Sequence, residues 1–314
     1  MQLYKSRGFG EYFSDTFLFI KKNGAHFFKN YFTISGIPVI VLMIISYFFI
    51  KFYTEFIQSS FLNNSNSSVI ENYINENGVL FVILVIIFII LATFIGILNY
   101  SYTPIYLNLY EKNEGKHFNL KEIINAYKKN FGKIILFVLA SFIVAIPVII
   151  IAGISMTILF FTIIGIPLIL LVIALISLFY HSSLIEYLQT NKGIFESFSY
   201  SLNLCFKKFW SAVGCVALFF IIVYIIQTII SLIPYFIGII SMVVDTQNGT
   251  SNQEENLTTV MSLMLFTYMV SFLLSIILST FTQLNQGIIF FSLKEEKENI
   301  NTKSDIDQIG MFVD

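Results

Sequence analysis

Residues 134–180 read IILFVLASFIVAIPVIIIAGISMTILFFTIIGIPLILLVIALISLFY and contain no Asp, Glu, Lys or Arg. A helix rises 1.5 Å per residue, so this block would extend roughly 70 Å, against ~30 Å for the hydrocarbon core of a bilayer. The block is therefore too long for one membrane-spanning helix and long enough for two. We expect the turn between them at Gly153 or within Ser155–Gly165. Pro147 and Pro167 fall inside the spans, where neighbouring helices tolerate kinks.

Three further stretches lack charged residues: Gly78–Tyr110, Phe209–Val244 and Asn256–Leu293. Charged residues make up 12% of the chain, against about 25% in soluble domains, which excludes a soluble globular protein. The sequence predicts an all-α polytopic membrane protein with six transmembrane helices. We place four of them at about 31–53, 79–101, 212–233 and 260–282, and the other two within 134–180.

The intervals between these spans carry further expectations. The Asn-, Ser- and Thr-rich segments 58–77 and 245–259 are expected to be flexible loops. Pro234 is expected to end or bend the fifth span. A seventh element that re-enters the membrane at 236–244 is an alternative, although nine residues cannot cross a bilayer. We expect no cleavable signal peptide, because the first long apolar run begins only near Ile34.

The distribution of basic residues predicts the orientation of the spans. In a six-span model, every Lys and Arg except Lys51 lies in the N-terminus, the loops 102–131 and 182–208 with their flanks, or the C-terminal tail. Loops rich in Lys and Arg stay in the cytoplasm. We therefore expect a multi-pass protein of the bacterial inner membrane, with both termini cytoplasmic.

A similar segment precedes each odd-numbered span. The three segments are FSDTFLFIKKNGAHFF (13–28), LKEIINAYKKNFGKII (120–135) and FESFSYSLNLCFKKFW (195–210). Each has apolar residues three or four apart and a lysine pair near its end. This spacing predicts an amphipathic helix, and its place before a span suggests a helix lying in the membrane interface.

This similarity predicts an internal triplication. The chain is expected to be a single membrane domain, 1–314, with repeat units at about 8–110, 111–190 and 191–298 and a flexible tail at 299–314. Each unit would comprise an interfacial helix followed by a helical hairpin. The alternative is that all inner flanks of membrane spans look alike, because all need aromatic and basic residues.

The segments FGEYFSDTFLFIKKNGAHFFKNYF, NLKEIINAYKKNFGKIILF and IFFSLKEEKEN resemble the membrane domain found beside bacterial glycerophosphodiester phosphodiesterases. They are also similar to stand-alone six-helix bacterial proteins of that superfamily. The resemblance covers nearly the whole chain but rests on pattern, not on catalytic signatures. It implies a six-helix membrane domain. It does not imply phosphodiesterase activity, because the chain has no room for the separate soluble barrel.

The lysine pairs are the first candidate binding feature. A lysine near an anionic leaflet contributes ~1 kcal/mol to membrane binding. The pairs could recognise lipid headgroups or could simply anchor the helices at a fixed depth. The headgroup candidates are Lys21, Lys22, Lys128, Lys129, Lys207 and Lys208.

Polar residues of the sixth span are the second candidate feature. Four of them recur at spacings of four, seven and four, so they share a helix face. This stripe could line a conduit, or it could bond neighbouring helices; Gln227 in the fifth span has the same two readings. The stripe candidates are Ser271, Ser275, Thr282, Gln283 and Gln286.

No catalytic, cofactor-binding or metal-binding constellation is apparent. The three histidines, His26, His117 and His181, have no metal-ligand spacing, and no nucleophile elbow or phosphate-binding loop occurs. The carboxylates Glu295 and Glu296 are expected to be solvated.

These features favour a non-enzymatic scaffold or accessory protein that engages membrane lipids, with anionic headgroups preferred, or a membrane protein partner. The alternative is a carrier or flippase for an amphiphilic solute. No nucleic-acid partner is expected.

The predicted orientation can be tested by cysteine labelling from outside the cell. Ser67→Cys and Gly249→Cys should react with a membrane-impermeant maleimide, and Glu114→Cys should not. The reverse pattern would overturn the orientation.

Overall fold

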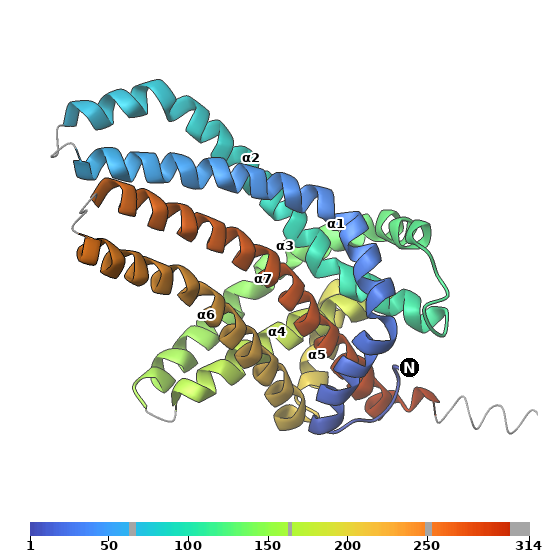
Figure 1. Cartoon of the computed structure of the whole chain (residues 1–314). Coiled ribbons are helices and arrows are strands. Elements are labelled where there is room, and N and C mark those ends of the chain that lie inside the picture. Colours follow the sequence, from blue (N-terminus) through green and yellow to red (C-terminus); the bar gives the residue numbers. More distant parts are fainter. Residues whose placement is uncertain (63–66, 163–164, 249–252, 302–314) are drawn as a thin grey trace, which may run out of the picture. The chain divides into compact units, whose positions relative to one another are not determined.

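The computed structural model describes residues 1–62, 67–162, 165–248 and 253–301. Every regular element in these residues is a helix. No strand occurs in this part of the chain. The helices of the described residues, labelled in Figure 1, are α1 (Phe9–Leu62), α2 (Ser67–Lys112), α3 (Leu120–Phe160), α4 (Gly165–Gln189), α5 (Ile194–Cys205), α6 (Phe209–Asn248) and α7 (Gln253–Glu298).

Within the described residues, six helices contain a segment long and apolar enough to cross a membrane, and α5 does not. The segments are Phe9–Phe49, Gly78–Lys112, Leu120–Phe160, Pro167–Gln189, Phe209–Ile237 and Phe266–Glu298. Their outer surfaces are apolar: Phe142, Ile149 and Phe160 of α3 are all about two-thirds exposed. Such a surface requires lipid around it. The prediction of an all-α polytopic membrane protein with six spans is confirmed.

The structure decides two expectations about the ends of the spans. Gly153 lies inside α3, and the turn falls after Phe160 and before α4, which confirms the alternative within Ser155–Gly165. Pro234 does not end the fifth span, because α6 continues through 236–244 to Asn248, which leaves no re-entrant element there. A proline ring is tolerated inside a helix when surrounding groups satisfy the one freed carbonyl.

The expected loops at 58–77 and 245–259 are also largely wrong. α1 continues to Leu62 and α2 begins at Ser67, while α6 continues to Asn248 and α7 begins at Gln253. Only 63–66 and 249–252 lie outside the described residues. The polar residues that suggested loops lose only about 0.5 kcal/mol each relative to Ala in a helix. A helix already formed in the membrane can therefore continue through them.

The predicted interfacial segments differ from one another. The first two are continuous with their spans in α1 and α3. A capping box begins α3: the Asn119 side chain accepts from Glu122 N, and the Glu122 carboxylate accepts from Asn119 N. Only the third is a separate helix, α5, divided from α6 at Phe206–Lys208. The internal triplication remains a prediction.

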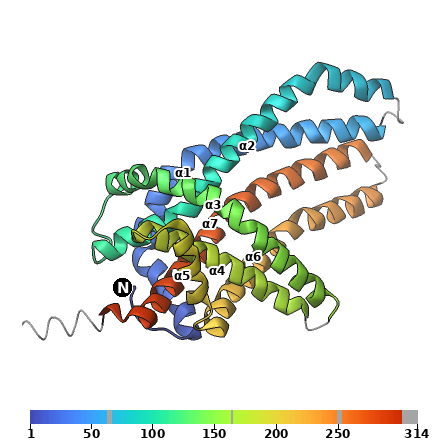
Figure 2. The same ribbon diagram turned by 180° about the vertical axis from the view of Figure 1, so that it is seen from behind.

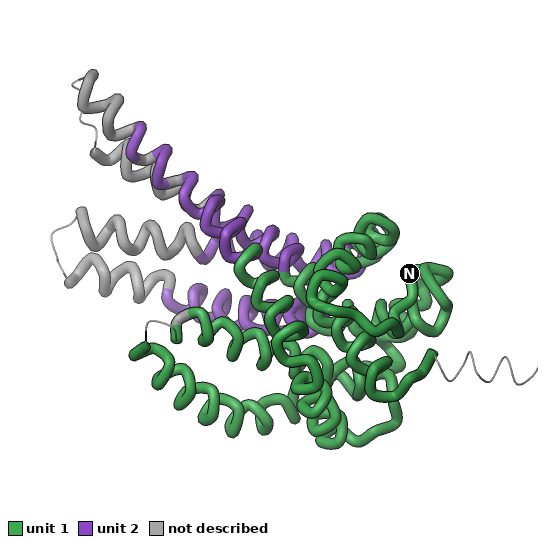
Figure 3. The backbone as a smooth tube through the Cα atoms, turned by 90° about the horizontal axis from the view of Figure 1, so that it is seen from below, with its two compact units in different colours: residues 1–31, 99–222, 279–314 green, residues 32–98, 223–278 purple. Residues whose placement is uncertain are grey.

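The chain forms two compact units, which Figure 3 colours separately. Unit 1 comprises residues 1–31, 99–222 and 279–314, and unit 2 comprises 32–98 and 223–278. In unit 1, α3 and α4 form an antiparallel hairpin and α5 packs on α4 (Figure 2).

Aromatic side chains form part of the core of unit 1. Phe27 packs edge-on against Tyr102 and Tyr106, with ring centroids 5.0 and 4.7 Å away. Both phenols are hydrogen bonded: Tyr102 donates to Phe27 O at 2.6 Å, and Tyr106 lies 2.8 Å from His26 Nδ1. Such contacts join the first part of α1 to the last part of α2.

A fully buried arginine fixes the N-terminal segment of unit 1. The Arg7 guanidinium donates to the carbonyls of Gln2, Leu3 and Lys5, and it pairs with Asp15 at 2.7 Å. Burying a charge is costly unless it is paired and hydrogen bonded. Residues 2–7 are therefore wrapped around a single cation and held in one conformation.

A buried carboxylate joins the ends of α4 and α7. Glu186 is fully buried, and its two oxygens accept from Lys192 at 2.6 Å and Lys294 at 2.7 Å. Lys294 also donates to Gln189 Oε1 at 3.0 Å. Tyr200 of α5 lies beside this group, with Lys192 Nζ 3.6 Å and Lys297 Nζ 3.8 Å from its ring centroid.

We expect Glu186→Ala to destabilise the protein by roughly 3–5 kcal/mol, because it leaves two ammonium groups without their counter-ion. Thermal unfolding in detergent measures the loss. Glu196→Ala is the matched control, because Glu196 is exposed on α5. Equal melting temperatures for the two variants would contradict the structural role of Glu186.

The two cysteines should be unreactive in the folded protein. Burial raises the pKa of the Cys205 thiol to about 12, and Cys215 is also buried. The thiolate is the reactive form, so a raised pKa keeps the thiol neutral and inert. Maleimide labelling should stay negligible from pH 7 to 9 and reach two thiols per chain after denaturation. Labelling of the folded chain that rises through pH 8.5 would contradict this.

Candidate functional site

The three lysine pairs have different surroundings. Lys21, Lys22, Lys128 and Lys129 are exposed, and their side chains make no hydrogen bond or ion pair with the described part of the chain. Lys207 and Lys208, in contrast, contact the end of α7. The first two pairs are therefore available to headgroups, while the third pair also helps to build the structure.

The apolar residues predicted to face the membrane are also divided. On α5, Phe195 and Leu202 are 59% and 43% exposed, while Phe198 is buried. The buried face of this helix includes Ser197 and Ser201. On α1, Phe27 is buried and Phe17 is 43% exposed. The outward apolar face is what an interfacial helix would turn to lipid.

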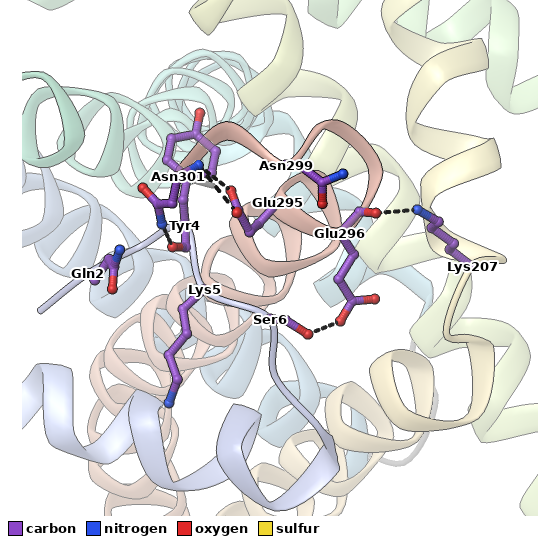
Figure 4. Close-up of a pocket in the computed structure, with 9 residues that line it drawn as sticks. All are labelled: Gln2, Tyr4, Lys5, Ser6, Lys207, Glu295, Glu296, Asn299 and Asn301. Atoms are coloured by element: carbon purple, nitrogen blue, oxygen red, sulfur yellow. Dashed lines mark hydrogen bonds between the residues drawn. The ribbon is translucent and has the colours of Figure 1, made fainter. Parts of the chain in front are cut away.

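A groove of about 580 Å³ lies in unit 1 between the N-terminal segment and the end of α7 (Figure 4). We call it the basic-end groove. One wall is made by Gln2, Tyr4, Lys5 and Ser6. The opposite wall is made by Lys207, Glu295, Glu296, Asn299 and Asn301.

Direct contacts hold the walls of the basic-end groove together. Ser6 Oγ donates to Glu296 Oε1 at 2.5 Å, and Lys207 Nζ donates to Glu296 O at 2.6 Å (Figure 4). Lys208 pairs with the same carboxylate. The Asn301 amide donates to Tyr4 O, and its main-chain N–H donates to Glu295 Oε2 at 3.1 Å. The groove is thus pre-formed.

The expectation that Glu295 and Glu296 are solvated is wrong for Glu295 and holds only in part for Glu296, which is half-buried. Glu295 is 7% exposed, and the Glu296 carboxylate carries the bonds from Ser6 and Lys208. Their partners lie up to 290 residues away in the sequence. No local signal could have revealed them, because the sequence shows only a charged helix end followed by polar residues.

Tyrosines near the basic-end groove remain protonated. Burial, together with the nearby charge of Glu111, raises the pKa of the Tyr4 phenol, whose oxygen accepts from Gln189 at 2.7 Å. Burial and the hydrogen bond to Glu298 raise the pKa of Tyr200. Both side chains therefore act as neutral hydrogen-bonding groups at physiological pH.

The polar stripe of the sixth span is divided between the two units. In unit 1, Thr282, Gln283 and Gln286 are buried, and Gln286 Nε2 donates to Ser177 Oγ of α4 at 2.7 Å. This part of the stripe packs against neighbouring helices. In unit 2, Ser271 and Ser275 line a second groove.

The second groove lies between α6 and α7 in unit 2 and also has a volume of about 580 Å³. We call it the α6–α7 groove. Gln227, the other candidate from the sequence, lines it on the α6 side. Three tyrosines also line it: Tyr224, Tyr235 and Tyr268.

Neither groove resembles an active site. In the described part of the chain, no group of three or more His, Cys, Asp or Glu side chains could hold a metal ion. His26 is hydrogen bonded to Tyr106 and Phe118 O. His181 is fully buried against Tyr100. The arrangement can bind polar groups.

Comparisons of the chain with protein-family models, with curated proteins and with solved structures find no match. The resemblance to membrane domains of glycerophosphodiester phosphodiesterases therefore remains a prediction from the sequence.

Proposed function

We propose that the chain is a non-enzymatic scaffold or accessory protein of the bacterial inner membrane that binds phospholipid headgroups in the basic-end groove. Both termini would lie in the cytoplasm, in agreement with the placement of Lys and Arg. The observation that carries the proposal is the position of Lys207, a headgroup candidate from the sequence, in the wall of a pre-formed polar groove.

The residues beside Lys207 support a position at the membrane interface. Phe206 is 56% exposed and Trp210 is 71% exposed. Their rings pack in sequence with Phe209, at centroid distances of 5.9 and 5.2 Å. Exposed aromatic side chains next to a lysine at the start of a span are typical of the headgroup level. A lipid headgroup would therefore reach the groove without leaving the bilayer.

The charges of the basic-end groove favour a zwitterionic headgroup. Lys5, which also pairs with Glu11 at 3.1 Å, and Lys207 supply two positive charges, and Glu295 and Glu296 supply two negative ones. A phosphate would bind the lysines, and a neighbouring ammonium would bind the carboxylate of Glu295, which still has unused lone pairs. Phosphatidylethanolamine carries both groups. A purely anionic lipid would place no positive group beside Glu295, whose one partner among the described groove residues is the neutral main-chain N–H of Asn301.

The free lysine pairs have a separate role in this proposal. Lys21, Lys22, Lys128 and Lys129 extend into solvent, and each adds ~1 kcal/mol of attraction to an anionic leaflet. This attraction is not selective for one lipid. It would hold the interfacial segments at the membrane surface while the groove selects the headgroup.

Native mass spectrometry of protein released from nanodiscs tests the proposal. We expect Lys207→Gln to reduce retained phosphatidylethanolamine about fivefold, the equivalent of ~1 kcal/mol. Lys128→Gln is the matched control, because Lys128 is equally exposed but lies outside the groove. Lys207→Arg should restore retention, since it keeps the charge.

A second variant tests the choice of headgroup. Glu295→Gln keeps hydrogen-bond acceptors for Asn301 but removes the charge that would hold an ammonium group. In nanodiscs that contain equal amounts of phosphatidylethanolamine and phosphatidylglycerol, this variant should lose the preference for phosphatidylethanolamine. If Lys207→Gln retains as much phosphatidylethanolamine as Lys128→Gln, the basic-end groove is not a headgroup site.

A further inference from the structure

The α6–α7 groove lies at membrane depth. Its α6 side extends from Tyr224 to Tyr235, which is about 16 Å along a helix. These residues belong to the apolar span Phe209–Ile237, and most of the α7 side belongs to the span Phe266–Glu298. The groove therefore offers polar side chains to a ligand that is itself inside the bilayer.

The hydroxyl groups of the groove have free acceptor capacity. Thr228 donates its proton to Tyr224 O at 2.8 Å, and Thr267 donates to Leu263 O at 2.9 Å. Each hydroxyl proton is thus used by its own helix, which leaves the oxygen lone pairs for another donor.

Gln227 and the tyrosines add donors. The structure records no hydrogen bond for the Gln227 amide within the described residues, and Tyr224 and Tyr268 are 71% and 63% exposed. An amide or hydroxyl without a partner costs a few kcal/mol in an apolar medium. A ligand that both donates and accepts hydrogen bonds would remove this cost.

The groove contains no charge. The stretches Phe209–Val244 and Asn256–Leu293 hold no Asp, Glu, Lys or Arg, so no side chain there can neutralise a phosphate or an ammonium group. Moving an unpaired ion into this environment is far more costly than moving a hydroxyl or an ester. The groove therefore discriminates by charge in favour of neutral ligands.

We propose that the α6–α7 groove binds the uncharged, hydroxyl- and ester-bearing end of a neutral amphiphile of the diacylglycerol class. The volume of about 580 Å³ lies within the range of ligand pockets, about 300–1,000 Å³. The hydroxyl of the ligand donates to Thr228 or Thr267, and its ester oxygens accept from Gln227 and the tyrosines. The acyl chains extend into the surrounding lipid. This site is independent of the phospholipid site proposed for unit 1.

Photo-crosslinking with a diazirine-labelled dioleoylglycerol tests this proposal in nanodiscs. The crosslinks should map to peptides containing 224–235 and 264–275. Unlabelled dioleoylglycerol should compete, and dioleoylphosphatidylglycerol, which has the same chains and a charged headgroup, should compete at least about tenfold less well.

Matched variants sharpen the test. Gln227→Leu should lower the crosslinking yield about fivefold, as expected for one lost hydrogen bond of ~1 kcal/mol. Thr228→Val should also lower it. Thr157→Val is the control, because Thr157 is exposed on a span and bonds Gly153 O in the same way, outside the groove.

Three results would overturn the proposal: crosslinks outside these peptides, equal yields for Gln227→Leu and the unmodified protein, or equal competition by the charged lipid. Lys207→Gln should leave the crosslinking yield unchanged. Failure of the headgroup site in unit 1 is thus distinguishable from failure of the α6–α7 groove.

Discussion

The structure depends on one constraint: a polar group inside a bilayer must find its partner within the protein or in a ligand, because no water is present. Helices satisfy the backbone, so the polar side chains decide how the spans pack. Asn285 of α7 illustrates this in unit 1, since its amide donates to Thr16 Oγ1 at 3.0 Å and to Tyr12 O at 3.3 Å. Asn99 likewise accepts from Tyr31 at 3.0 Å. These buried contacts specify which helices meet.

The same constraint explains why polar residues of similar spacing have different roles. Gln286 in unit 1 bonds Ser177 and is buried, whereas Ser271 and Ser275 in unit 2 line an open groove. A helical stripe states only that residues share a face. The stripe does not reveal which group lies opposite that face. The opposite group determines whether the residues bond a neighbouring helix or a ligand.

Sequence reasoning recovered the six spans because their signal is local: long runs without charge can be read directly. It failed at the polar segments after the first and fifth spans, where helices continue through residues of only modest helix propensity. It also missed the buried state of Glu186 and Glu295. Glu186 is paired with Lys294 of α7 as well as with Lys192, and Glu295 accepts from the main chain of Asn301 while lying beside the N-terminal segment. Burial of a charge is a tertiary property, and a single sequence offers no pattern that encodes it.

Lys207 and Gln227 were both candidates from the sequence, and both line grooves in the structure. The sequence could rank neither above its neighbours, because Lys128 and Gln286 look equivalent in the pattern. What separates them is the shape of the surface around each side chain.

The position of Trp210 has a practical consequence. The chain contains one tryptophan, and this residue is 71% exposed at the start of α6, three positions from Lys207. Indole emission is sensitive to the polarity around the ring. The tryptophan fluorescence of the protein therefore comes from a single side chain that lies close to the basic-end groove. Its spectrum in different bilayers would therefore read the polarity of that one interface without any added dye.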